Sequence, residues 1–167
     1  LIFINERLPL NKNIEIEIQL ISPNGKVPSQ KHASDIGYDI SSSNDVTLKS
    51  NEVTLVNTGI AISLPQQCAG FVLPRSGLST KHKITLINSP GLIDPGYTGE
   101  LLVPLMNYGN KDYDIKAGDR IAQLVLVNTH GVDFKVVDSL PETDRSSGGF
   151  GSTCLLYTSP SPRDVEE

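Results

Sequence analysis

The sequence predicts an all-β fold, and three observations support this prediction. Residues 13–20 alternate strictly between apolar and polar side chains, which is the period of a strand with one buried face. Further short apolar runs follow, and most of them are separated by Pro, Gly, Asn or Asp, which favour turns. No long segment carries a helical period. A sandwich, a jelly roll and a closed barrel all accommodate this many strands, and the pattern alone does not separate them.

The expected elements follow in chain order. After the strand at 13–20, the apolar runs predict strands at 53–56, 59–64, 71–73, 84–87, 101–106, 121–127 and 132–137. One helix is expected between Ser76 and Lys83. The segment is short and contains a glycine, so the prediction is limited to one or two turns.

Length and charge limit the possible functions. A chain of 167 residues is long enough for one compact domain with a hydrophobic core. The net charge of -5 argues against a broad surface for nucleic-acid polymers, whereas a small basic pocket for a single nucleotide is compatible with it. The spacing of Cys68 and Cys154 indicates neither a disulfide scaffold nor a zinc site, and it fits a reducing compartment.

No targeting signal or membrane span is expected. The longest apolar runs are far shorter than the ~20 residues that cross a bilayer. A cytoplasmic location is therefore predicted, or a nuclear one for a eukaryotic or viral protein.

Residues 145–153 suit a nucleotide. Arg145 can pair with phosphate oxygens, the glycines let backbone N–H groups face an anion, and Phe150 offers a flat face to a base. On composition alone a flexible Gly/Ser linker is the more common interpretation. Other segments of the chain favour the nucleotide.

Two segments before the predicted helix carry charged groups beside glycines. In 35–39, two carboxylates flank a glycine, and Asp39 can reach a hard cation, although a solvated turn is the common alternative. In 74–79, a proline, Arg75, a serine and a glycine follow a strand end. This second segment suits an anion, or equally a structural turn with a salt-bridging arginine.

Two later segments offer further polar groups. Residues 88–100 predict a hairpin or tight loop, in which Asp94 beside Tyr97 can act as a general base or simply cap a turn. In 117–124, a turn enters a strand, and the period places Gln123 on the face of Ile121 and Val125. A glutamine on that face needs a polar partner, such as phosphate or water.

Several common chemistries are disfavoured. The chain contains no Gly-x-x-x-x-Gly-Lys-Ser/Thr loop of the P-loop proteins. Its three histidines, His32, His82 and His130, lack the close spacing of a metal site, and a Ser-His-Asp triad has weak support.

Taken in order, the five segments resemble the motifs of the trimeric deoxyuridine triphosphate nucleotidohydrolases, the dUTPases. The resemblance runs from about residue 14 to 153, and five motifs in the correct order are not a chance match. The motifs are Gly-Tyr-Asp at 37–39, Pro-Arg-Ser-Gly-Leu at 74–78, Gly-Leu-Ile-Asp-x-x-Tyr-x-Gly-Glu at 91–100, Gly-Asp-Arg-Ile-Ala-Gln at 118–123, and Arg-x-x-Gly-Gly-Phe-Gly-Ser-Thr at 145–153.

The resemblance implies a jelly-roll-like distorted β-barrel that assembles as a homotrimer, with active sites where subunits meet. It also implies Mg²⁺ bound to the triphosphate and attack of water on the α-phosphorus. The products would be dUMP and pyrophosphate, so the enzyme would limit uracil in DNA and supply dUMP. No polymer or membrane partner is implied.

The resemblance also assigns roles in recognition of the base and sugar. Asp94 would activate the water and meet the 3′-hydroxyl of the deoxyribose, and Tyr97 would stack on the sugar and exclude a ribose. Asn88 would read the uracil edge together with the backbone of Gly91, Leu92 and Ile93.

The remaining roles concern the triphosphate. Asp39 would hold metal-bound water. Arg75 would bind phosphate, or instead be structural through a salt bridge near Asp119 or its neighbours. The other phosphate contacts would be Ser76, Gly77 and Gln123, and the closing contacts would be Arg145, Phe150, Gly151, Ser152 and Thr153.

The domain organisation expected from these motifs has three parts. Residues 1–144 form the β domain, 145–153 form a glycine-rich lid, and 154–167 form a tail of non-native or disordered sequence. The chain departs from the family at Pro95 and Gly96, which reshape a turn, and at Cys154, which bears on the last lid contacts.

Two other functions are compatible with parts of the sequence. A dCTP deaminase shares the fold and a similar Asp-Pro-Gly-aromatic run, but its essential Glu aligns with Pro104, which cannot act as an acid or base. A catalytically silent nucleotide-binding regulatory protein could use the same scaffold. Retention of Asp94 argues against this second alternative.

Overall fold

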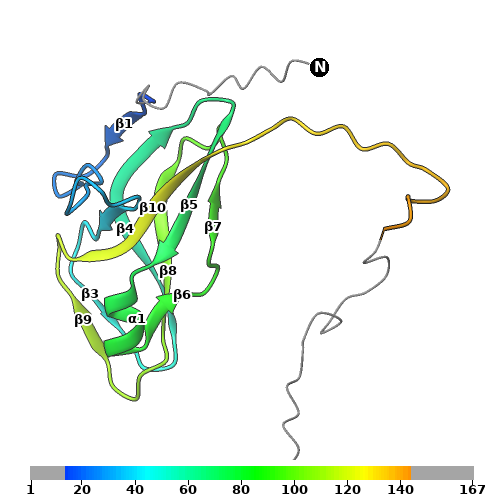
Figure 1. Cartoon of the computed structure of the whole chain (residues 1–167). Coiled ribbons are helices and arrows are strands. Elements are labelled where there is room, and N and C mark those ends of the chain that lie inside the picture. The colour runs from blue at the N-terminus through cyan, green and yellow to red at the C-terminus, as the bar shows by residue number, and fades with distance from the viewer. Residues whose placement is uncertain (1–13, 144–167) are drawn as a thin grey trace, which may run out of the picture. The chain divides into compact units, whose positions relative to one another are not determined.

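The computed structural model describes residues 14–143, and the chain divides into two units after Gly131. The described part of the first unit is mostly β-structure with one short helix (Figure 1). The strands are β1 (Glu17–Leu20), β2 (Tyr38–Ser41), β3 (Val46–Leu48), β4 (Val53–Ser63), β5 (Cys68–Pro74), β6 (Ile84–Leu86), β7 (Gly91–Ile93), β8 (Glu100–Asn107), β9 (Tyr113–Ile115) and β10 (Arg120–Asn128), and the helix is α1 (Ser76–His82). The predicted all-β class is confirmed.

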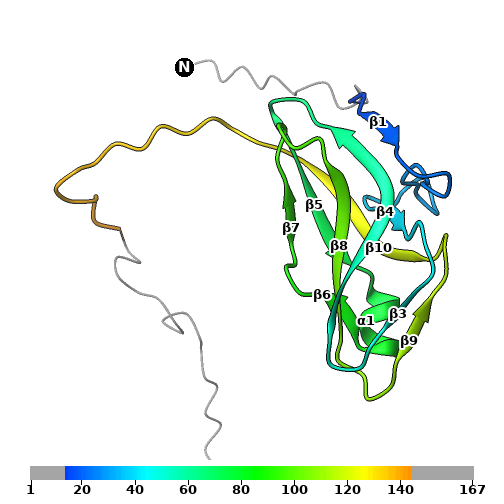
Figure 2. The same ribbon diagram turned by 180° about the vertical axis from the view of Figure 1, so that it is seen from behind.

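The strands form two four-stranded antiparallel sheets, with strand orders β1-β4-β8-β6 and β2-β10-β5-β7. A two-stranded sheet of β3 and β9 lies beside α1 in both views (Figures 1 and 2). The rings of His82 on α1 and Tyr113 on β9 are 4.8 Å apart, so the helix packs against this small sheet.

One hydrophobic core joins all three sheets. Inward-facing side chains of each strand meet there while alternate residues face outward, as the period of a strand requires. The buried members include Ile40, Leu48, Ile60, Val72, Val103, Leu105, Ile115, Ile121 and Leu124. These side chains hold together the strand ends that carry the polar motifs.

β4 is one continuous strand, although the pattern predicted two strands, at 53–56 and 59–64. Its pairing with β8 shifts between Asn57, opposite Leu102, and Ala61, opposite Glu100. Gly59 within this bulge has φ of 69°, a conformation that glycine adopts without strain. The interruption in the apolar period therefore marks a bulge inside one strand.

The predicted helix is present, but several short strands were not predicted. The helix is confirmed and ends at His82, where Lys83 takes a left-handed conformation with φ of 58°. Four short strands, β2, β3, β7 and β9, were missed, because three or four residues are too few to establish a period. Their positions depend on pairing with distant strands.

The strand predicted at 132–137 is absent from the single chain. The described part of the second unit, residues 132–143, contains neither strand nor helix. The apolar alternation of this segment leaves Val132, Phe134 and Val136 66%, 94% and 96% exposed. A strand needs a neighbour for its backbone hydrogen bonds, and alternation alone does not provide one.

Across residues 14–143, no helix has the length and apolar character needed to span a bilayer.

Candidate active site

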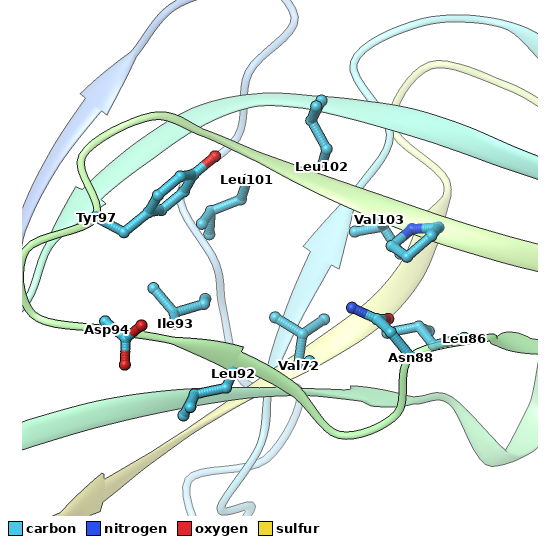
Figure 3. A pocket seen from close by; sticks show the side chains of 12 residues that line it. Val72, Leu86, Asn88, Leu92, Ile93, Asp94, Tyr97, Leu101, Leu102 and Val103 are labelled. Carbon is cyan, nitrogen blue, oxygen red and sulfur yellow. The ribbon is translucent and has the colours of Figure 1, made fainter.

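A cavity of about 230 Å³ opens between β7 and β8, next to the third motif. Most of its lining side chains are apolar, and its polar side chains come from the two loops that flank β7 (Figure 3). The lining residues are Val72, Leu86, Asn88, Gly91, Leu92, Ile93, Asp94, Tyr97, Leu101, Leu102, Val103 and Pro104. We call this cavity the β7–β8 pocket.

The segment 94–99 leads from one sheet to the other rather than forming a hairpin. β7 pairs with β5, whereas β8 pairs with β4 and β6, so only the tight-loop alternative of the prediction is correct. The N–H of Tyr97 donates to the carbonyl of Asp94 at 3.0 Å and closes a turn. This turn places the Asp94 carboxylate and the Tyr97 ring at the same end of the pocket (Figure 3).

Asp94 is the one carboxylate among the residues that line the β7–β8 pocket. It is exposed, so a water molecule can reach it. Pro104, where a deaminase would carry its essential Glu, also lines the pocket and provides no ionisable group. The described pocket can therefore support one general base and no second carboxylate.

Asn88 lies at the opposite end of the pocket from Tyr97 (Figure 3). A Cβ atom at Gly91 would lie 3.2 Å from its Nδ2 atom, so glycine at this position leaves space for the amide. β7 is the edge strand of its sheet within residues 14–143. One side of the Gly91–Ile93 backbone is therefore available to the edge of a flat ring.

A second cavity, of about 480 Å³, lies where β5 ends and α1 begins, beside the first residues of β2 and of β10. Its lining is rich in charged and hydroxyl groups. The lining residues are Lys31, Asp35, Ile36, Gly37, Asp39, Leu73, Arg75, Ser76, Gly77, Arg120, Gln123 and Val125. We call this cavity the cationic pocket.

Asp39 forms an ion pair with two arginines in the cationic pocket. Its Oδ1 atom accepts from Nε of Arg75 at 2.8 Å, and its Oδ2 atom accepts from Nη1 of Arg120 at 2.8 Å. Nη1 of Arg75 also donates to the carbonyl of Arg120 at 3.0 Å. The side chains of Asp39 and Arg75 are 17% and 25% exposed, so these bonds restrict both groups to one geometry.

The salt bridge expected for Arg75 therefore involves Asp39 and not Asp119. The carboxylate of Asp119 instead accepts from the backbone N–H of Lys116 at 2.8 Å, within its own turn. The sequence could not distinguish these partners, because Asp39 lies 36 residues from Arg75 and meets it only through sheet pairing.

Gln123 and Val125 line the cationic pocket together, as predicted, but Ile121 does not. A register shift between Arg120 and Ala122 turns Ile121 into the core. Nε2 of Gln123 donates to the carbonyl of Pro74 at 2.9 Å. A Cβ atom at Gly37 would lie 2.5 Å from its Oε1 atom, which explains the glycine of the first motif.

Two cations of the pocket, Lys31 and Arg120, were not among the predicted contacts. Arg120 stands inside the fourth motif, so its position was available as a signal. Lys31 belongs to no motif, and only the tertiary structure brings it to this pocket. With Arg75, the described part of the pocket holds three side-chain cations against two carboxylates, Asp35 and Asp39.

The two pockets divide the predicted contacts between them, and no described residue lines both. The β7–β8 pocket has the groups expected for base and sugar and no lysine or arginine, whereas the cationic pocket has the groups expected for phosphates. The contacts predicted at Arg145, Phe150, Gly151, Ser152 and Thr153 lie outside the described residues.

Comparison with known protein families identifies the family of this chain. The dUTPase family model matches residues 23–154. The chain belongs to the dUTPase family. This dUTPase is 40% identical over 151 residues to the deoxyuridine 5′-triphosphate nucleotidohydrolase of Thermobifida fusca, a match that covers 90% of the chain and 84% of that protein. It is 46% identical over 132 residues to the enzyme of the same description from Finegoldia magna, with 78% and 92% covered.

Solved structures agree with this assignment. The dUTPase of Staphylococcus bacteriophage 80alpha, solved with dUpNHpp, matches with a TM-score of 0.80 and 29% identity, covering 86% of this chain and all of that one. A dUTPase variant from phage phi11 of S. aureus, described with a structural Mg(II) ion, matches with a TM-score of 0.73 and 28% identity, covering 77% and 100%. The dUTPase-like fold is thus confirmed, and the chain is a dUTP diphosphatase that hydrolyses dUTP.

Proposed function

We propose that the chain converts dUTP to dUMP and pyrophosphate by attack of an Asp94-activated water on the α-phosphate. The observation that carries the proposal is the turn that places Asp94, the one carboxylate of the β7–β8 pocket, beside Tyr97. A base at this end of the pocket would act where the sugar meets the phosphates, with its oxygens also open to the 3′-hydroxyl.

Recognition of the nucleoside would use both ends of the β7–β8 pocket. The amide of Asn88 and the free edge of β7 offer donors and acceptors to uracil, and a cytosine reverses that pattern. The Tyr97 ring lies at one end of the pocket and would form the wall under the sugar, where a 2′-hydroxyl would collide with it. Crowding of the walls would exclude the methyl group of thymine.

The cationic pocket would bind the triphosphate. Arg75, Arg120 and Lys31 supply positive charge, and Ser76, Gly77 and Gln123 supply polar contacts. Asp39 would serve this pocket by orienting both arginine side chains, which a single carboxylate does through its two oxygens.

The same residues fit Mg²⁺ held mainly by the substrate. Within residues 14–143, no three His, Cys, Asp or Glu side chains gather as a metal cage. Mg²⁺ with a nucleotide needs only one or two carboxylates, because phosphates and waters complete its shell. Asp39 keeps lone pairs beyond its two arginine bonds and would accept from metal-bound waters, with Asp35 nearby in the lining. Bound there, Mg²⁺ would offset charge on the phosphate oxygens.

Assembly as a homotrimer would unite the two pockets, with the β7–β8 pocket of one subunit facing the cationic pocket of another. Two observations support self-association. The outer faces of β4 and β8 are apolar, with Val53, Leu55 and Leu102 52%, 57% and 39% exposed. The exposed apolar side chains of 132–137 also need cover, which another subunit would provide.

The domain limits and location remain part of the proposal. Residues 145–153 would close over the bound nucleotide as a lid, and 154–167 would lie outside the domain. The reaction would take place in the cytoplasm, or in the nucleus of a eukaryotic host.

The first experiment measures pyrophosphate release from dUTP, dCTP, dTTP and UTP with Mg²⁺, for the wild-type chain and for Asp94→Asn. Release from dUTP alone is expected, and the variant should lose about 10²- to 10⁴-fold in kcat, the range typical of a missing general base. Full turnover of Asp94→Asn would disprove the assigned role, and ammonia release from dCTP would favour the deaminase.

A further inference from the structure

The Tyr97 ring is held in place by its own turn and by the first residue of β8. Its hydroxyl donates to the backbone carbonyl of Glu100 at 2.7 Å, while its N–H donates to the carbonyl of Asp94 at 3.0 Å. Tyr97 is still 44% exposed, and it lines the β7–β8 pocket. Contacts beneath the ring therefore decide how far it projects into the space for the sugar.

Gly99 provides the surface on which the ring rests. A Cβ atom at this position would lie 2.8 Å from Oη, 2.9 Å from Cζ and 3.2 Å from Cε2 of Tyr97. The colliding atoms all belong to a side chain, so alanine would displace the ring rather than the strand. Gly96, in the same turn, has no atom within 4 Å of an added Cβ, and neither glycine has a left-handed φ.

Glu100 is in turn anchored to the bulge of β4. Its Oε1 atom accepts from the N–H of Gly59 at 2.8 Å, and its Oε2 atom accepts from Nδ2 of Asn57 at 3.0 Å. The hydroxyl of Thr58 donates to the carbonyl of Leu101 at 2.6 Å. The bulge thus holds the start of β8, where the Glu100 carbonyl accepts from the Tyr97 hydroxyl and which Gly99 directly precedes.

We propose that Gly99 and Glu100 are positioning residues for sugar selection: the β4 bulge, through the Glu100 carboxylate, sets the height of the Tyr97 ring above Gly99 and so the exclusion of ribonucleotides. The inference rests on the proposed role of Tyr97 as the wall beneath the sugar. Neither residue touches the substrate, and both act through the tyrosine.

The decisive comparison is Gly99→Ala against Gly96→Ala, with the ratio of kcat/KM for dUTP to that for UTP as the readout. Gly99→Ala should lower this ratio by about tenfold or more, because the displaced ring no longer fits the deoxyribose alone. Gly96→Ala adds the same methyl group to the same turn and should keep the wild-type ratio. An unchanged ratio in Gly99→Ala, or equal losses in both variants, would overturn the proposal.

Variants of Glu100 give a second, independent reading. Glu100→Ala removes the carboxylate that accepts from Gly59 and Asn57, and it should lower the ratio of kcat/KM for dUTP to that for UTP. Glu100→Gln retains an acceptor for Gly59 and should keep most of the wild-type ratio. A purely structural role predicts a lower Tm with an unchanged ratio in Glu100→Ala. That result would also overturn the proposal.

Tyr97→Ala separates failure of this inference from failure of the proposed function. If Tyr97→Ala loses discrimination while Gly99→Ala keeps it, the tyrosine selects the sugar but is not positioned by Gly99. If Tyr97→Ala discriminates normally, the assigned role of the tyrosine fails, and with it the positioning of that ring for selection.

Discussion

Asp39 forms ion pairs with Arg75 and Arg120, and it is proposed to accept from metal-bound water as well. Its role therefore depends on which groups bind to each of its two oxygens. Each oxygen accepts one arginine bond, and the side chain is 17% exposed. Burial of a charge is tolerated only with such partners. The arginines therefore explain why a carboxylate can stand in a pocket that is proposed to bind an anionic triphosphate.

Replacement of Asp39 by Asn should raise the Mg²⁺ concentration for half-maximal activity by about tenfold or more, because a partner in the outer shell of the metal is lost. Titration of dUTP hydrolysis with Mg²⁺ measures this change. Asp35→Asn, a carboxylate of the same pocket that accepts from the backbone N–H of His32, is the control and should change the Mg²⁺ requirement less. An unaltered requirement in Asp39→Asn would leave Asp39 only its role towards the arginines.

At the scale of elements, two ion pairs connect the residues that flank β3 to the residues that flank β9. Nζ of Lys49 lies 2.6 Å from Oδ2 of Asp112, and Nζ of Lys116 lies 3.0 Å from Oδ2 of Asp45. Hydrogen bonding from the Lys49 ammonium, and then from the backbone N–H of Ser50, lowers the pKa of Asp112. The backbone N–H of Ala117, followed by the Lys116 ammonium, lowers the pKa of Asp45.

A lowered pKa in the folded state means that these carboxylates stabilise the fold above their ordinary pKa of 3.8. The contribution should disappear as the pH falls through the lower pKa of the folded state. Both pairs are exposed, so Asp112→Asn should lower Tm at neutral pH by no more than about 2 °C. Thermal unfolding between neutral pH and about pH 3 tests this, and the difference from wild type should become smaller once the pH falls below the ordinary pKa of the carboxylate.

Asp133→Asn, an exposed carboxylate of the second unit, is the control for this titration and should show no comparable change in Tm. A difference between Asp112→Asn and wild type that persists undiminished in acid would show that the effect of Asp112 is not electrostatic.

At the scale of the whole molecule, the outer face of β4 and β8 predicts association between copies. Pairing places Leu55 opposite Pro104 and Asn57 opposite Leu102, so the exposed side chains form one surface. The opposite faces of β4 and β8 point into the core. A sheet with apolar side chains on both faces indicates that both are covered in the functional state.

Leu55→Glu should therefore weaken the proposed trimer, because a charge would be buried in an apolar contact. Sedimentation should show the dissociation constant raised by at least about tenfold, equivalent to ~1.4 kcal/mol, and dUTP hydrolysis should fall with dissociation. Tyr108→Glu is the control, since Tyr108 is 53% exposed against 57% for Leu55 but lies beyond the end of β8. An intact, active trimer in Leu55→Glu would exclude this face from the interface.

The fold class, the helix and the family could be predicted from the sequence, because these depend on local signals. Alternation over 13–20 and the turn residues indicate strands without any knowledge of their partners. The motif residues Asp94 and Tyr97 are three positions apart, so one turn brings them together, and the sequence could predict their proximity.

Contacts between residues that are distant in the sequence could not be predicted and are seen only in the folded chain. Asp39 and Arg120 reach one pocket through the pairing of β2 with β10, which no local period encodes, and Lys31 joins them from the segment before β2. The bulge in β4 aligns Gly59 with Glu100, 41 residues away, and the 132–137 segment remains unpaired within the described chain despite its strand-like alternation. Local pattern sets which face of a strand is apolar, whereas register and neighbours follow from the packing of the whole core.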